Sequence, residues 1–144
     1  MIEIKTSELI GPALDWAVAH ATQAWMWAHE WFPTMTLDPT FRGVSDNAPD
    51  GHVNLVPSNP MRQGSQTFKP STDWAQGGPL IENYRVEFTF ERDGLIFAEL
   101  CEADGSYTKL YTGTFGPNHL VAACRAIVAA KLGDTVSVPR ELMQ

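Results

Sequence analysis

The stretch STDWAQGG, residues 71–78, combines side chains that could bind a small polar molecule. The indole of Trp74 offers a flat face for stacking and an N–H donor. The carboxamide of Gln76 carries one acceptor and two donors in a plane, which suits the edge of a base or a ribose. Two glycines permit positive φ angles and a close backbone approach, and a nearby cation could meet a phosphate. The candidate ligand-binding residues are Ser71, Thr72, Asp73, Trp74, Gln76, Gly77, Gly78 and Arg85.

The same stretch also has a purely structural interpretation as a sharp turn. Asp73 can accept hydrogen bonds from the backbone amides that follow it, and the two glycines allow a tight bend. Pro79 would then direct the chain into an extended exit. This interpretation explains the aspartate, the glycines and the proline, but it gives Trp74 and Gln76 no role. Both interpretations stay open at this point.

No catalytic or metal-binding pattern is present in the sequence. The serines lack a G-x-S-x-G elbow, the glycines form no phosphate-binding loop, and the carboxylates form no close local pair for acid–base work. The histidines have no zinc-ligand spacing, and ordinary surface or capping roles are expected for His20, His29, His52 and His119. We therefore expect no enzyme, no catalytic residue, no cofactor and no metal.

Composition and charge argue against nucleic acid polymers and membranes as binding partners. The chain has 144 residues with a net charge of -7, and 10 Lys and Arg are scattered among 17 Asp and Glu. Without a basic stripe, binding of a nucleic acid polymer is disfavoured, although a pocket with one or two cations for a small anion is allowed. No apolar run could span a membrane, and the N-terminal residues MIEIKTSEL lack the basic and apolar regions of a secretion signal. We expect one cytoplasmic domain over residues 1–144, with Cys101 and Cys124 as buried free thiols.

The second half of the chain predicts an antiparallel meander followed by a helix. Residues 84–91 alternate between apolar and polar, Asp93-Gly94 is a strong hairpin signal, residues 95–102 return, and 107–115 form a third strand. A helix then has Pro117 in its first turn and Gly133 as the αL residue that ends it. Its apolar stripe predicts packing on the meander. Residues 134–142 predict one more extended segment, which ends at Pro139.

The first half predicts a helix and then a long insertion. A short apolar piece at residues 2–4 precedes cap residues Thr6 and Ser7, with Pro12 in the first helical turn. An apolar face of Leu14, Ala17, Val18 and Ala21 follows, and the helix either ends near Thr22 or continues through residue 24. Residues 24–32 suit either a strand or a helix. Seven prolines make 33–79 an irregular insertion, either functional or covering a sheet, with a short strand near 53–56.

These elements predict an α+β fold: an antiparallel β-meander packed against a C-terminal helix, with an N-terminal helix and a long proline-rich irregular insertion. The aromatic cluster in the first half is more typical of a core or a subunit interface than of a ligand platform, so we expect a homo-oligomer. The cluster consists of Trp16, Trp25, Trp27 and Trp31.

Three blocks resemble the NinX-like phage proteins, the P22 NinX family. They are KTSELIGPALDWAVAHA at 5–21, PSTDWAQGGPLIE at 70–82 and LVAACRAIVAAKLGDTVSVPREL at 120–142. The resemblance implies a phage or prophage accessory protein that works in the bacterial cytoplasm, and it brings no catalytic residues. In broad plan the chain is also similar to small phage sponge proteins that sequester host immune nucleotide signals, including the anti-Thoeris kind.

Three functions follow as expectations. The first is a non-enzymatic protein that binds a small nucleotide-like ligand and sequesters a host immune signal. The second is a protein-interaction factor that binds and inhibits a host protein, with residues 71–78 only structural. The third is an enzyme that cleaves such a nucleotide.

Overall fold

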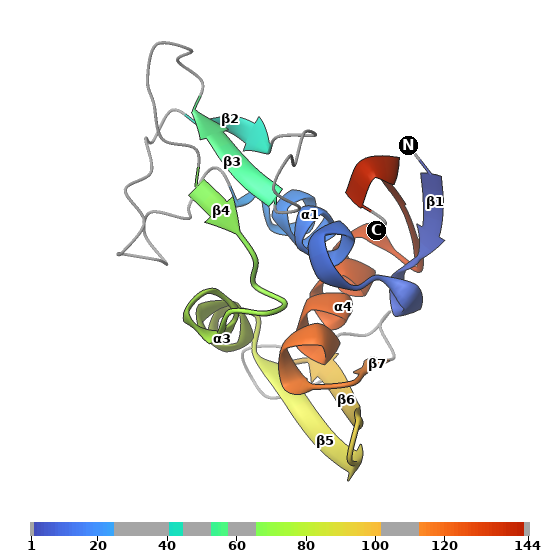
Figure 1. Cartoon of the computed structure of the whole chain (residues 1–144). Coiled ribbons are helices and arrows are strands. Elements are labelled where there is room, and N and C mark those ends of the chain that lie inside the picture. Colours follow the sequence, from blue (N-terminus) through green and yellow to red (C-terminus); the bar gives the residue numbers. More distant parts are fainter. Residues whose placement is uncertain (1, 25–40, 45–52, 58–65, 102–112, 143–144) are drawn as a thin grey trace.

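The computed structural model describes residues 2–24, 41–44, 53–57, 66–101 and 113–142 (Figure 1). The helices in these ranges are α1 (Gly11–Thr22), α3 (Trp74–Asn83) and α4 (His119–Leu132). The strands are β1 (Ile2–Lys5), β2 (Phe41–Val44), β3 (Val53–Pro57), β4 (Gln66–Phe68), β5 (Val86–Arg92), β6 (Leu95–Leu100), β7 (Thr114–Gly116) and β8 (Thr135–Val138). Short 3₁₀ helices cover Thr6–Glu8 and Arg140–Leu142. The fold is α+β, as expected.

The meander of β5, β6 and β7 confirms the predicted hairpin. The sheet order is β5-β6-β7 with both pairs antiparallel, and the turn at Gly94 has a φ of 79°. Asp93-Gly94 therefore reverses the chain as the sequence predicts. The first strand begins at Val86 rather than at residue 84. Strand β7 overlaps the end of the predicted third strand at residues 114 and 115. Residues 107–112 of that prediction lie outside the described ranges.

The buried face of β5 is shorter than the alternation predicts. Val86 and Phe88 are half-buried and pack against the core, whereas Phe90 on the same face is 64% exposed. Figure 1 shows why: the end of the hairpin extends beyond α4, so this helix does not cover the last residues of the strand.

Helix α4 lies at the centre of the molecule, between the meander and α1 (Figure 1). Asn118 caps it by accepting a 2.9 Å hydrogen bond from the Val121 backbone N–H. Pro117 precedes this cap instead of lying in the first turn. Gly133 does end the helix, but with φ 94° and ψ −168° it lies outside the αL region that we expected. The apolar stripe is buried as predicted, and Lys131 at its end is exposed.

Helix α1 ends at Thr22, because Gln23 turns left-handed with φ 52° and ψ 52°. Pro12 is in the first turn as predicted, but Ile10 is the N-cap, so the capping role given to Thr6 and Ser7 is wrong. Those residues form a 3₁₀ turn instead. The Thr6 hydroxyl donates to the Gly133 carbonyl at 2.7 Å, and β1 pairs antiparallel with β8 beside it.

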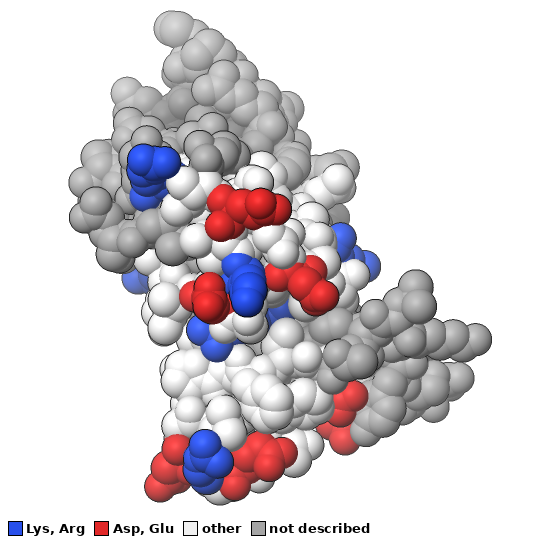
Figure 2. Space-filling view, turned by 90° about the vertical axis from the view of Figure 1, so that its right-hand side faces the viewer, with Lys and Arg blue, Asp and Glu red and all other residues white. Residues whose placement is uncertain are grey.

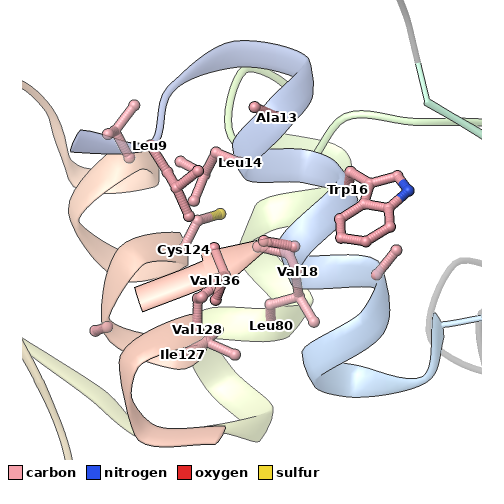
Figure 3. Packing of buried hydrophobic residues seen from close by; sticks show 14 of the residues in the cluster. Leu9, Ala13, Leu14, Trp16, Val18, Leu80, Cys124, Ile127, Val128 and Val136 are labelled. Carbon is pink, nitrogen blue, oxygen red and sulfur yellow. The ribbon is translucent and has the colours of Figure 1, made fainter. Parts of the chain in front are cut away.

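The core fills the space between α1, α4 and β8 (Figure 3). Figure 3 shows Leu14 and Val18 of α1 facing Cys124 and Ile127 of α4, with Leu80 of α3 next to Val18. Trp16 is also buried, which confirms a core role for that member of the tryptophan cluster. The other three tryptophans lie outside the described residues.

Both cysteines are free, as expected. Burial, together with the nearby charge of Asp15, raises the pKa of the Cys124 thiol well above its usual value. Cys101 is only half-buried, so the expectation of two buried thiols holds for Cys124 alone. The Cys101 thiol lies 3.4 Å from a carboxylate oxygen of Glu87.

The proline-rich insertion is more regular than the sequence predicts. Strands β2, β3 and β4 form a three-stranded antiparallel sheet, and β3 confirms the expected short strand. The first turns of α3 also fall within residues 33–79. Within the ranges that the structure covers, no helix is long and apolar enough to cross a membrane.

Candidate functional site

Residues 71–78 are mostly helical, so the interpretation of this stretch as a loop with an extended exit is wrong. Helix α3 begins at Trp74 and continues through Pro79 to Asn83. Asp73 is its N-cap, and its carboxylate accepts a 2.9 Å hydrogen bond from the Ala75 backbone N–H. That contact confirms the predicted bonding of Asp73 to a following amide, but it starts a helix instead of closing a turn.

Both glycines are helical and neither adopts a positive φ, and only Gly77 lies in a tight packing contact. A methyl group on Gly77 would overlap the Leu120 side chain and lie 2.6 Å from the Pro70 carbonyl oxygen. Gly77 thus lets α3 approach both the preceding turn and α4. Gly78 has open space around it, and its missing side chain relieves the clash that a proline imposes on a helical residue before it. Pro79 can therefore stay inside the helix.

Gln76 fastens α3 to the end of β4. Its side-chain oxygen accepts a 2.8 Å hydrogen bond from the Lys69 backbone N–H, and its nitrogen donates a 3.0 Å hydrogen bond to the Thr67 carbonyl. Two backbone groups of one segment thus occupy the planar amide. The structure makes Gln76 a support for the turn before α3, not a group that faces a ligand.

We expect Gln76→Ala to lower the free energy of unfolding by about 1–3 kcal/mol, because it leaves the half-buried Lys69 N–H and Thr67 carbonyl without their partner. Thr72→Ala is the matched control: this exposed neighbour makes only a 3.5 Å contact with the Lys69 carbonyl. Its effect should stay within about 0.5 kcal/mol. Urea denaturation followed by circular dichroism measures both, and equal small effects would show that the Gln76 bridge contributes nothing.

Ser71 connects the turn before α3 to helix α1. Its backbone N–H donates a 2.9 Å hydrogen bond to the Asp15 carboxylate, and both residues are buried. The Ser71 hydroxyl has no partner of good hydrogen-bond geometry among the described residues, although its proximity still favours the ionised carboxylate. Burial outweighs these contacts and the more distant charge of Lys69, and it raises the pKa of Asp15 to about 7.

A surface cavity of about 490 Å³ lies where the first turns of α3 and α4 meet. The turn before α3 and the start of α4 form its walls, with Ser71, Thr72, Trp74, Asn118, His119 and Leu120 as lining residues. The side chain of Trp74 is 58% exposed. Its indole centroid lies 6.4 Å from that of the His119 imidazole, which meets the Phe88 ring edge-on at 4.9 Å. Phe88 thereby supports His119, while the indole face stays accessible.

The structure brings only part of the predicted set together. Ser71, Thr72 and Trp74 line the Trp74–His119 cavity, and Asp73 caps the helix beside it. Gln76, Gly77 and Gly78 belong to the packing of α3. Arg85 lines a different cavity, of about 280 Å³, together with Tyr84, Cys101 and Lys131. It is therefore not a phosphate ligand for the Trp74–His119 cavity.

Sequence reasoning missed Asn118 and His119, the second wall of the cavity. The signal available was the cap pattern before α4, where an asparagine lies two residues before the first apolar residue of the stripe. That pattern places both residues at a helix start, but it does not say that this start lies beside Trp74. Fold packing alone brings the two segments together.

The cavity can hold a flat polar molecule without covalent chemistry. It offers two aromatic rings and the exposed hydroxyl of Thr72, whereas the Ser71 hydroxyl is buried. In the part of the chain that the structure describes, no group of three His, Cys, Asp or Glu side chains could hold a metal ion. The arrangement therefore suits stacking and hydrogen bonding.

Comparison with known protein families identifies one relationship. The model of the family described as "Bacteriophage P22, NinX" matches residues 5–131. This match covers α1, the Trp74–His119 cavity and nearly all of α4. No curated protein matches the sequence. Because the family model spans most of the chain, this protein belongs to the bacteriophage P22 NinX family.

Proposed function

We propose that this protein is a non-enzymatic phage accessory protein that binds a small nucleotide-like ligand in the Trp74–His119 cavity. In this proposal, each subunit of a homo-oligomer holds its ligand in the host cytoplasm and keeps a nucleotide immune signal from its receptor. The observation that carries the proposal is the exposed indole of Trp74 beside a cavity of about 490 Å³.

The exposure of Trp74 needs an explanation, because burying an indole stabilises a protein and exposing one does not. In α3 the residue points away from the core, whereas Leu80 of the same helix is fully buried. Trp74 therefore contributes little to the fold. An indole that faces an open cavity, with a second ring 6.4 Å away, is a stacking platform for a flat ligand.

The size and polarity of the cavity favour a nucleotide-like molecule. Ligand cavities in proteins typically have volumes of roughly 300–1,000 Å³, and this one falls within that range. The exposed hydroxyl of Thr72 supplies a polar contact beside the aromatic faces. The starts of α3 and α4 both line this region; the Asp73 carboxylate already meets the positive end of the α3 dipole, whereas the positive end of the α4 dipole is left for an anionic substituent on the ligand.

Calorimetry with a panel of ADP-ribose derivatives and cyclic dinucleotides tests the proposal. We expect one class to bind, and Trp74→Ala to weaken that binding roughly 5- to 150-fold, since a base stacked on an aromatic ring is worth about 1–3 kcal/mol. Phe90→Ala is the matched control, because Phe90 is a similarly exposed aromatic residue that does not line the cavity.

Two results would count against nucleotide binding. One is the absence of heat with every member of the panel. The other is unchanged affinity in the Trp74→Ala variant. If a ligand binds, denaturing the complex and analysing the released molecule separates sequestration from cleavage. A sequestering protein returns the ligand intact, whereas an enzyme returns products.

A protein-interaction factor is the second candidate, and the distribution of exposed aromatic residues favours it. Trp74 and Phe90 are both more than half exposed. His119 contacts both Trp74 and Phe88, and Phe90 lies two residues after Phe88 in the same strand. Exposed aromatic residues of this kind anchor protein interfaces. Under this alternative, Trp74→Ala and Phe90→Ala should both weaken capture of a stoichiometric host protein, and no small ligand should bind.

A further inference from the structure

A second cavity, of about 390 Å³, lies on the other side of α4 from the Trp74–His119 cavity. Its walls come from the end of β1 and the 3₁₀ turn after it, from β7, from the middle of α4 and from the start of β8. The residues that matter for its chemistry are Lys5, Ser7, Phe115, Arg125, Asp134 and Thr135. Neither the family match nor the proposed function assigns it a role.

Arg125 is the central group of this cavity. The side chain is half-buried in α4, and two backbone carbonyls from opposite walls orient it. Its Nε–H donates to the Leu9 carbonyl at 2.8 Å, and Nη1 donates to the Phe115 carbonyl at 2.9 Å. A guanidinium has five N–H donors, so further donors remain for another partner.

The charge of Arg125 has no carboxylate partner within the described ranges. Its hydrogen bonds are to neutral carbonyl groups, and burial alone lowers the pKa of the guanidinium. Asp134 lines the same cavity but forms no ion pair with it. A half-buried cation without a counter-charge is unfavourable, and an anion in the cavity would relieve that cost.

The other lining groups extend the site in a consistent way. Lys5 adds a second cation, and Ser7 and Thr135 add exposed hydroxyl groups. The hydroxyls of Thr6 and Thr114 already donate to carbonyls, so they are not donors for a ligand. Phe115 is 46% exposed and lies against Phe97 with ring centroids 4.8 Å apart, which gives the cavity a fixed apolar wall.

The surroundings limit the size of the anion. Figure 2 shows the side of the molecule that carries β1 and β7. Cationic side chains on this face alternate with carboxylates, and no continuous basic area is present among the coloured residues. A nucleic acid polymer needs such an area, whereas a small anion needs only the local cations.

We propose that this cavity binds a small organic anion, with its carboxylate or phosphate on the guanidinium of Arg125 and the ammonium of Lys5 and its flat apolar part against Phe115. The site is independent of the Trp74–His119 cavity, so either one can fail without the other.

Nuclear magnetic resonance of the ¹⁵N-labelled full chain tests the site, with phenyl phosphate as the probe and phenol as its neutral analogue. We expect saturable shifts at the Arg125 Nε–H and at the Gly113 and Thr135 amides. Phenol should bind at least about tenfold more weakly, because it lacks the charge-assisted hydrogen bonds. Benzoate should bind at the same residues, since carboxylate and phosphate share this recognition.

Matched lysine variants separate this site from general charge effects. Lys5→Gln should weaken phenyl phosphate binding roughly 2- to 5-fold, the size expected for an exposed charge. Lys131→Gln removes another exposed lysine, which lines the Arg85 cavity instead, and should change nothing. Trp74→Ala should also leave this binding unchanged. The proposal is overturned by an absence of saturable shifts at Arg125, by equal binding of phenol, or by equal effects of the two lysine variants.

Discussion

Gly77→Ala is expected to lower the free energy of unfolding by about 3 kcal/mol or more, whereas Gly78→Ala should change it by no more than about 1 kcal/mol. The added methyl group at Gly77 would overlap the Leu120 side chain and lie 2.6 Å from the Pro70 carbonyl oxygen. The carbonyl is backbone and cannot rotate away, so α3 must move as a unit. At Gly78 nothing lies within 4 Å of the added methyl group.

The two neighbouring substitutions are chemically identical, which makes the comparison sharp. Both glycines are helical and neither has a positive φ, so backbone strain does not distinguish them. The gain in helix propensity from alanine at Gly78 is offset by the clash that a side chain before Pro79 introduces. Urea denaturation of both variants measures the difference. Similar stabilities would show that α3 does not need its close approach to α4.

The sequence predicts the β5–β6 hairpin and helix α4 correctly. Asp93-Gly94 fixes a hairpin turn through local backbone preferences, and the apolar stripe from Leu120 to Val128 fixes a buried helix face. Both signals act within a few residues, so the structure follows them closely. The predicted extended segment before Pro139 is also confirmed, as strand β8 over Thr135–Val138.

Helix α3 was missed because its sequence opposes a helix locally. Gly77, Gly78 and Pro79 are consecutive residues of low helix propensity, and they read as a turn. The stabilising contacts come from elsewhere: Gln76 bonds to β4, Gly77 packs on Leu120, and Leu80 is buried in the core. Tertiary contacts of this kind override propensity, and a single sequence does not display them.

In the candidate site too, some features follow from residue type and others depend on tertiary contacts. Trp74 was identified from its side-chain chemistry, and its exposure agrees with that interpretation. Gln76 has equally suitable chemistry, but its amide is occupied by backbone partners of β4 and the following turn. Whether a polar side chain faces a ligand or its own backbone depends on the path of the chain. Residue type alone does not decide it.

Asp15→Asn is expected to abolish a stability loss that the unsubstituted protein shows between pH 5 and pH 8. Burial raises the pKa of Asp15 from 3.8 to about 7, so the folded state binds this proton more tightly than the unfolded state does. The contribution to stability is therefore fully present below pH 3.8 and is lost as the pH rises through about 7. Between pH 5 and pH 8 the loss should amount to about 2–3 kcal/mol.

The asparagine variant isolates this effect because its side chain is neutral at every pH and its oxygen can still accept from the Ser71 N–H. It should match the unsubstituted protein only below about pH 3.8, exceed its stability already at pH 5 and exceed it by more at pH 8. Asp15→Ala should be less stable than the asparagine variant at every pH, since it leaves the buried Ser71 N–H without an acceptor. Urea titrations at a series of pH values measure all three proteins. If the asparagine variant kept the full pH dependence, another group, and not Asp15, would have to carry it.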